Sequence, residues 1–245
     1  MPVWLDRAEH IEALLDAAGQ LDRRAGTRGG HDQMGGLIYR RALLATLGFA
    51  GLRMSELTAL RWRDLDLAGN RLIMPTSKTD AGVRQIDLLP VLRDELAAYT
   101  AGAPITAPDG YVFATAAGTQ PKQANIRRRV FDQALELANE KLVEAGDVPL
   151  PEQLTPHQLR HTFASILVTS GVDPGVVMDQ LGHADPGFTL RVYRHGMRRD
   201  PTARERLRAL VGAIEWAPTG TRGSNGALAD LIAARPPTPN TAPRQ

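Results

Sequence analysis

A histidine and an arginine with the residue types of a phosphate site lie three positions apart, at His157 and Arg160, in the segment TPHQLRHTFAS. Thr155, Pro156 and Gln158 predict the start of a helix here, because they match an N-cap, a proline at the first helical position and a capping-box partner. Side chains three residues apart leave the same face of a helix, and the free amide groups of a first turn favour an anion. The pair is therefore suited to hold a phosphate. An ordinary helix start with His157 in a surface hydrogen bond is the alternative that this segment alone leaves open.

Tyr193 lies in the next predicted helix, among Arg191, Arg194 and Arg198. A lone tyrosine on a helix usually packs in the core or faces solvent, and these arginines are what set Tyr193 apart. Residues 187–208 hold seven arginines against two acidic residues, a local charge of +5, and residues 127–129 are a second basic cluster. Such clusters are typical of a phosphate-binding surface. A solvated face and the codon usage of a GC-rich genome are alternative explanations for the overall excess of 26 arginines over three lysines. The clustering is the part that favours nucleic acid.

The composition excludes several kinds of site. The chain has 245 residues, 43% of them hydrophobic, a net charge of +2 and no cysteine, so disulfides, zinc–thiolate sites, iron–sulfur clusters and a cysteine nucleophile are ruled out. The sequence has no apolar run as long as a membrane span, and the N-terminus lacks a signal-peptide pattern. We therefore expect a cytoplasmic protein. Because no carboxylates cluster at metal-ligand spacing, we expect no metal and no cofactor.

The elements that must position these residues are mostly helical. Apolar periodicity and capping residues predict helices at 6–18, 37–48, 51–57, 124–143, 155–170, 173–182 and 185–193, with a Gly-rich break at 25–36. Three short segments, DLDL, NRLIMP and RQIDL, predict an antiparallel sheet joined by a turn at 68–70 and a longer turn, SKTDAGV. The expected fold class is α+β, mainly helical, with a small three-stranded antiparallel sheet.

The C-terminal part of the chain has a different composition. Beyond Trp216 the sequence is dominated by Pro, Gly, Thr and Asn. Such a composition buries too little apolar surface to fold by itself. We therefore expect one domain over 1–216 and a flexible tail over 217–245, with a short helix at 227–234.

Four blocks of the sequence together carry a family resemblance. They are, in order, GLRMSELTALRWRDLDL, SKTDAGVRQIDL, TPHQLRHTFAS and LGHADPGFTLRVYRH. Over residues 1–212 this series resembles the catalytic domain of the tyrosine recombinase (phage integrase) family. The resemblance implies a recombinase that cleaves and rejoins DNA strands.

The resemblance also implies roles for particular residues. Arg53 and Arg160 match the two arginines that grip the scissile phosphate, and Glu56 matches a residue that helps to hold the first arginine. Lys78 falls between the second and third predicted strands, where the family keeps its catalytic lysine. Two forked guanidinium groups can neutralise the charge that a phosphodiester gathers in its transition state without a metal ion.

The remaining catalytic roles fall on two histidines and the tyrosine. His157 and His183 match the two histidine positions of the family, and Tyr193 matches the nucleophile. Only about one tyrosine in a thousand is ionised at pH 7, so the nucleophile needs cationic surroundings and a proton acceptor. We expect His157 to accept the proton and Lys78 to protonate the departing 5′ oxygen. The expected product is a 3′-phosphotyrosyl bond.

The expected partner is double-stranded DNA. Family members usually carry a helical DNA-binding domain ahead of the catalytic domain, whereas this chain opens with VWLDRAEHIEALLDAA, which resembles the opening of the catalytic domain itself. We therefore expect an isolated catalytic domain of bacterial or phage origin. It should be monomeric when free and part of a tetramer on recombining DNA in its full-length form, where residues 227–234 are a candidate for packing onto a neighbouring subunit.

Two alternative functions remain for the sequence. One is a DNA-binding regulatory remnant without strand exchange, which the intact set of site residues disfavours. The other is a metal-dependent nuclease, which the lack of a carboxylate cluster disfavours. Tyr39, Tyr99 and Tyr111 are expected to pack in the core. His161 is expected to pack or to face solvent, although it could flank the phosphate, and His195 is expected to take no part in the chemistry.

Overall fold

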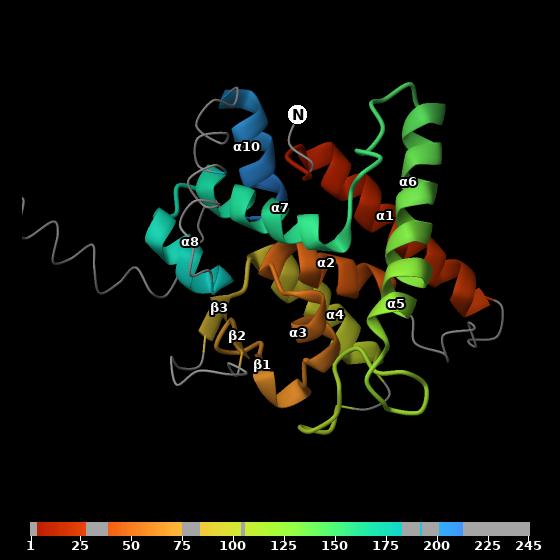
Figure 1. The fold of residues 1–245 in the computed structure, drawn as a ribbon, viewed down its shortest axis with the longest axis vertical. Coiled ribbons are helices and arrows are strands. Elements are labelled where there is room, and N and C mark those ends of the chain that lie inside the picture. The colour runs from red at the N-terminus through yellow and green to blue at the C-terminus, as the bar shows by residue number, and fades with distance from the viewer. Residues whose placement is uncertain are drawn as a thin grey trace, which may run out of the picture.

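The computed structural model describes residues 4–27, 39–74, 84–103, 106–182, 192 and 201–212. Over these ranges the chain is mainly helical, with one three-stranded antiparallel sheet at the edge of the helices (Figure 1). This is the fold class that the sequence predicts.

The helix α2 (Arg40–Ala50) lies at the centre of the molecule. Its sequence, RRALLATLGFA, is apolar on all sides, and each of its residues except Arg41 is buried. It packs against α1 (Ala8–Thr27), α4 (Pro90–Gly102) and α7 (Pro156–Thr169). The Asp22 carboxylate of α1 accepts hydrogen bonds from the backbone N–H groups of Arg40 and Arg41, at 3.2 and 3.1 Å. These bonds satisfy amides that the first turn of a helix leaves free.

The helix α1 is longer than the sequence predicts. The expected apolar stripe is buried: Ile11, Leu14, Leu15 and Ala18. The helix nevertheless continues through Gly19 to Thr27. The extension lies against α2, where a Cβ atom added to Gly19 would be 3.2 Å from Cδ of Arg41. Tertiary contact with α2 therefore outweighs the low helix propensity of glycine.

The sheet follows the predicted order. Its strands are β1 (Leu65–Asp66), β2 (Arg71–Met74) and β3 (Arg84–Asp87), with β2 in the middle. Leu72 pairs with Ile86 across β2 and β3, and both side chains are fully buried. Asn70, at the turn between β1 and β2, has a φ of 60°. Asparagine tolerates this left-handed conformation better than most residues, which explains why the chain reverses there.

The segment predicted as one helix over 124–143 is divided by a wider turn. It consists of α5 (Gln123–Ile126), a π-helical turn (Arg127–Phe131) and α6 (Asp132–Glu144). The predicted core stripe is confirmed at its buried members, Ile126, Val130, Ala134, Ala138 and Leu142, while Leu135 is half-buried. A periodicity of 3.6 residues does not reveal a π turn, because one extra residue leaves most of the apolar stripe in place.

The remaining elements are α3 (Met54–Ala59), a 3-10 turn (Trp62–Asp64), α8 (Pro174–Leu181) and α10 (Pro201–Leu210). The Asp173 side chain accepts the Gly175 N–H at 2.7 Å and caps α8, as predicted. The helices α4 and α10 have no counterpart with stated bounds among the predicted helices. The helix predicted at 185–193, apart from Val192, and the tail at 217–245 lie outside the described residues. Within the described ranges, no helix combines the length and the apolar character needed to cross a membrane.

Candidate functional site

Arg160 is a buried arginine held at both terminal nitrogens. It lies in the second turn of α7, which begins where the sequence predicts, with the Gln158 side chain accepting the Thr155 N–H. Its side chain is almost completely buried, and its two terminal nitrogens donate to the carbonyl oxygens of Gly51 and Leu181. The carbonyls come from the end of α2 and the last residue of α8. Arg160 therefore joins three helices.

Arg53 reaches the same place from the segment that connects α2 to α3. The Glu56 carboxylate accepts its backbone N–H at 2.7 Å and its Nη1 at 2.9 Å. Its Nη2 lies 3.4 Å from the carbonyl oxygen of Gly182, the residue after Leu181. The side chain of Arg53 remains 45% exposed. Two guanidinium groups that are far apart in the sequence thus contact consecutive carbonyls at the C-terminal end of α8.

Glu56 also binds a third arginine, which the sequence analysis did not name. Nη1 and Nη2 of Arg84 donate to Oε1 and Oε2 of Glu56, each at 2.9 Å. Burial would by itself raise the pKa of Glu56, but the hydrogen bonds from Arg84 and Arg53 outweigh it and hold the pKa at about 2. Glu56 is therefore ionised at neutral pH. A sequence signal for Arg84 did exist, because the alternation of a strand puts its side chain on the same face as the core residue Ile86.

The three guanidinium groups give the site its electrostatic character. Burial, followed by the positive charges of Arg53 and Arg84, lowers the pKa of Arg160 to about 9, whereas Glu56 acts in the opposite direction. Arg160 therefore remains protonated at pH 7, in a setting with more positive than negative charge. An anion brought against the exposed side of this cluster would relieve that imbalance. Forked guanidinium donors match the oxygens of a phosphate in particular.

His157 lies one helical turn from Arg160 and is suited to accept a proton. Its pKa is lowered by partial burial first and by the charges of Arg160 and Arg53 second. The imidazole is therefore neutral at pH 7. Its ring meets that of His161 edge-on, with 5.2 Å between centroids, and His161 in turn stacks on Trp4 at 6.0 Å. His161 thus makes packing contacts, as expected.

The structure brings together four of the seven residues that the sequence analysis assigned to the site: Arg53, Glu56, His157 and Arg160. The other three, Lys78, His183 and Tyr193, lie outside the described residues. Their described neighbours in the sequence belong to this region or to the core. The carbonyl oxygen of Gly182, which precedes His183, accepts a hydrogen bond from Nη2 of Arg53. Val192, which precedes Tyr193, is fully buried.

The tyrosines expected to pack are divided between the core and the surface. Tyr39 is buried against Tyr99 and Phe113, and the Tyr99 hydroxyl donates to the carbonyl oxygen of Val112 at 2.6 Å. Tyr99 and Tyr111 are both half-buried, but Tyr99 packs against the core, whereas the Arg61 guanidinium lies 4.8 Å from the centroid of the Tyr111 ring. Core packing is thus confirmed for Tyr39 and Tyr99, whereas the expectation for Tyr111 was wrong, because its ring serves as a platform for an arginine.

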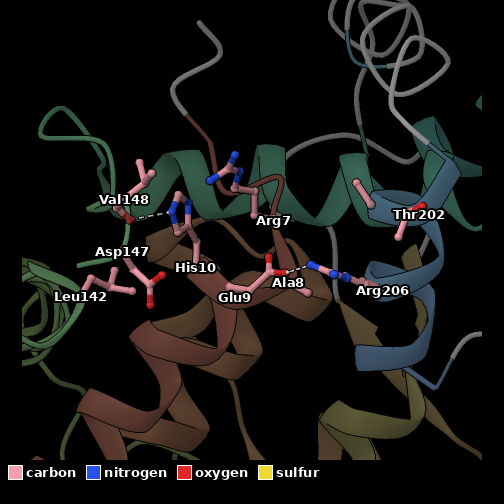
Figure 2. Close-up of a pocket in the computed structure, with 10 residues that line it drawn as sticks. Arg7, Ala8, Glu9, His10, Leu142, Asp147, Val148, Thr202 and Arg206 are labelled. Carbon is pink, nitrogen blue, oxygen red and sulfur yellow. Dashed lines mark hydrogen bonds and ion pairs between the residues drawn. The ribbon is translucent and has the colours of Figure 1, made fainter. Parts of the chain in front are cut away.

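A cavity of about 620 Å³ lies elsewhere, between the start of α1, the end of α6 and α10 (Figure 2). The His10 Nε2–H donates to the carbonyl oxygen of Val148 at 3.0 Å, and Glu9 pairs with Arg206 at 2.8 Å. None of Arg53, Arg84 and Arg160, which together form the arginine cluster described above, lines this cavity. In the part of the chain that the structure describes, no three His, Asp or Glu side chains gather as a metal site would require.

Comparison with known sequences identifies a family and several relatives. The sequence profile of the phage integrase family matches residues 9–199. The tyrosine recombinase XerC of Xanthomonas axonopodis pv. citri (strain 306) is 37% identical over 160 residues, which are 63% of this chain and 46% of that protein. An integrase/recombinase of Escherichia coli is 31% identical over 177 residues, which are 60% of this chain and 52% of that protein. The chain therefore spans about half the length of these relatives.

Comparison with solved structures finds the same fold. The XerA recombinase matches with a TM-score of 0.60 and 22% identity, covering 85% of this chain and 63% of that one. A lambda integrase dimer (residues 75–356) bound to a COC′ core site matches with a TM-score of 0.53 and 14% identity, covering 79% of this chain and 60% of that one. At these identities the likeness establishes the fold alone.

Proposed function

The chain belongs to the phage integrase family, and from this premise we propose that it is the catalytic unit of a site-specific tyrosine recombinase. It cleaves and rejoins DNA strands through a 3′-phosphotyrosyl intermediate. The observation that carries this proposal is the meeting of Arg53 and Arg160 at the C-terminal end of α8. Two arginine side chains fixed at one point, with a neutral histidine beside them, are what a metal-independent phosphoryl transfer requires.

Each proposed role has a defined chemical step. The Tyr193 hydroxyl attacks the phosphorus of the scissile phosphodiester while its proton passes to His157. The bond from phosphorus to the 5′ oxygen breaks, and Lys78 gives that oxygen a proton. Arg53 and Arg160, with His183, stabilise the negative charge on the non-bridging oxygens.

Rejoining is the reverse of cleavage. A 5′ hydroxyl attacks the phosphotyrosyl bond, which has retained the energy of the phosphodiester, so no ATP is consumed. If the attacking hydroxyl comes from a second DNA molecule, the strands are exchanged. The proposed partner is therefore double-stranded DNA, with the chain monomeric when free and part of a tetramer during recombination in a full-length form.

The test is covalent capture of DNA in the presence of EDTA. The wild-type chain is incubated with a pool of randomised duplexes, each carrying a nick that lets a short 5′-hydroxyl fragment diffuse away after cleavage. Adducts that survive SDS are recovered from a denaturing gel and their duplexes sequenced. The control is Tyr193→Phe, which removes the nucleophilic oxygen and leaves the surface for DNA unchanged.

Wild-type adducts that Tyr193→Phe does not form would support the proposal. If both proteins bind DNA and neither forms an adduct, the chain is a DNA-binding module without catalysis. Cleavage that needs magnesium and leaves no adduct would instead identify a nuclease. Each result assigns the chain to one class.

A further inference from the structure

Arg84, the first residue of β3, forms a bidentate ion pair within the arginine cluster. Its two terminal nitrogens bridge the two oxygens of Glu56, each at 2.9 Å, and its side chain is only 9% exposed. A bidentate pair of this kind fixes the plane of the carboxylate as well as its position. The strand β3 lies beside α8, as Figure 1 shows, so Arg84 approaches the cluster from the sheet.

The same carboxylate holds Arg53. Oε2 of Glu56 accepts the backbone N–H of Arg53, and Oε1 accepts its Nη1. Arg53 is 45% exposed, so its guanidinium has few other contacts to restrict its rotamers. The position of Arg53 therefore depends on Glu56, and the position of Glu56 depends on Arg84.

Arg84 is also packed against the end of α8. A Cβ atom added to Gly182 would lie 3.1 Å from Cδ and 3.1 Å from Nη1 of Arg84, so the backbone of α8 approaches the guanidinium closely. The Gly182 carbonyl is the group that Arg53 contacts. Arg84 thus binds the Glu56 carboxylate and lies close to the C-terminal end of α8, the two groups that locate Arg53.

We propose that Arg84 is a positioning residue of the phosphate site, which acts by fixing Glu56 and through it the guanidinium of Arg53. Arg84 does not itself contact the phosphate, because its side chain is buried and both its terminal nitrogens are bound to Glu56. The proposal rests on the proposed function for its effect on catalysis, whereas its effect on Arg53 belongs to the free protein.

The pKa of Glu56 also shows that Arg84 is its main cationic partner. Burial would raise the pKa of Glu56, and the hydrogen bonds from Arg84 are the largest of the opposing effects. Without Arg84, a half-buried carboxylate would keep Arg53 as its one cationic partner in the described structure. Glu56 would then take up a proton at a higher pH and lose part of its hold on Arg53.

The first arm of the test needs no DNA. The Nη–H resonances of Arg53, whose Nη1 binds Glu56, are followed by nitrogen-15 NMR in the free wild-type chain, in Arg84→Met and in Arg84→Lys. Arg84→Met should raise the hydrogen exchange of the Arg53 side chain toward that of an exposed arginine. Arg84→Lys keeps a charge but bridges one oxygen at a time, so it should give an intermediate rate. Unchanged exchange in Arg84→Met would overturn the proposal.

The second arm measures single-turnover cleavage of the duplex recovered by covalent capture. Arg84→Met should slow cleavage by about 10- to 100-fold, the usual cost of removing a partner that orients a binding group, with DNA affinity nearly unchanged. In a Glu56→Gln background the same substitution should slow cleavage little further, because its route to Arg53 is already broken. Full additivity of the two substitutions would show that Arg84 does not act through Glu56.

A matched control separates positioning from general destabilisation. Arg40→Met breaks another buried ion pair, Arg40 with Asp22 at 3.3 Å, at the N-terminal end of α2, the opposite end from Gly51. At a temperature where both variants are fully folded, Arg40→Met should cleave at the wild-type rate. If it slows cleavage as much as Arg84→Met does, the effect is structural and the proposal fails. If the wild type forms no adduct at all, the proposed function fails, and the NMR arm still decides the role of Arg84.

Discussion

At the scale of single residues, the protonation state of His157 decides whether it can accept a proton. Partial burial and the charges of Arg160 and Arg53 lower its pKa. We therefore predict that NMR titration of the His157 ring gives a pKa below the reference value of about 6.5. Arg53→Met should move this pKa upward, whereas Arg206→Met, on α10 and paired with Glu9, should not.

The sign of the accompanying pH effects follows from this lowered pKa. Well above the reference pKa of about 6.5 the histidine is neutral in both the folded and the unfolded chain. As the pH falls through that value, the unfolded chain binds the proton first, so this group disfavours folding as the pH falls. Cleavage should decline as the pH falls through the lowered pKa. A His157 pKa above the reference value would contradict its role as the proton acceptor.

Lys78 provides the second prediction at this scale, as the proposed general acid. Lys78→Ala should slow cleavage of ordinary DNA by about 10²- to 10⁴-fold. A substrate with sulfur in place of the bridging 5′ oxygen should largely restore the rate, because a thiolate leaves without a proton. Lys122→Ala removes another lysine, on the exposed segment before α5, and should cleave both substrates normally. Equal slowing on both substrates would exclude Lys78 as the acid.

The sequence grouped four residues that the folded chain brings together, and it missed a fifth. Arg53, Glu56, His157 and Arg160 were identified by their motifs, and the structure places them together. Arg84 was missed because its partner, Glu56, lies in another element, 28 positions earlier. A motif records which residue types recur, but only the folded chain shows which carboxylate a buried arginine contacts.

At the scale of elements, the turn that ends α2 positions both arginines. Gly51 has a φ of 60°, and a Cβ atom there would lie 2.5 Å from Cδ1 of Phe163 and 3.0 Å from Cδ2 of Leu181. Gly51→Ala should therefore destabilise the fold by about 3 kcal/mol through backbone strain and overpacking. Urea denaturation measures this change in the free energy of unfolding.

The matched control for this prediction is Gly48→Ala in the same helix. A Cβ atom at Gly48 would meet nothing within 4 Å. Because alanine favours a helix over glycine, this substitution should stabilise the protein by up to about 1 kcal/mol. Similar effects of the two substitutions would show that the space around Gly51 is not what constrains the turn.

Element prediction succeeded where local signals were strong. The caps at Thr155 and Asp173 and the three short strands gave elements close to those observed. The extension of α1 beyond Ala18 and the π turn at Arg127–Phe131 were not predicted. The first depends on contact with α2, and the second leaves the apolar periodicity almost unchanged.

At the scale of the whole molecule, the size of the chain limits the DNA contacts that the proposed function leads us to expect. The chain spans about half the length of its curated relatives. We predict weak binding to duplex DNA that falls steeply with salt, with log K decreasing by about 0.9 per phosphate contact for each log unit of salt. Fusing a helical DNA-binding domain of the family ahead of Val3 should tighten binding and steepen the salt slope. An unchanged slope would mean that the added domain contacts no further phosphates.

The most direct measurement of the central claim is the chemical identity of the bond between protein and DNA. The wild-type adduct formed in EDTA is digested with protease and nuclease, and the nucleotide-bearing peptide is sequenced by tandem mass spectrometry. The account predicts a nucleotide joined through its 3′ phosphate to Tyr193, with a free 5′ hydroxyl on the released strand. A nucleotide on any other residue, or one joined through a 5′ phosphate, would contradict it.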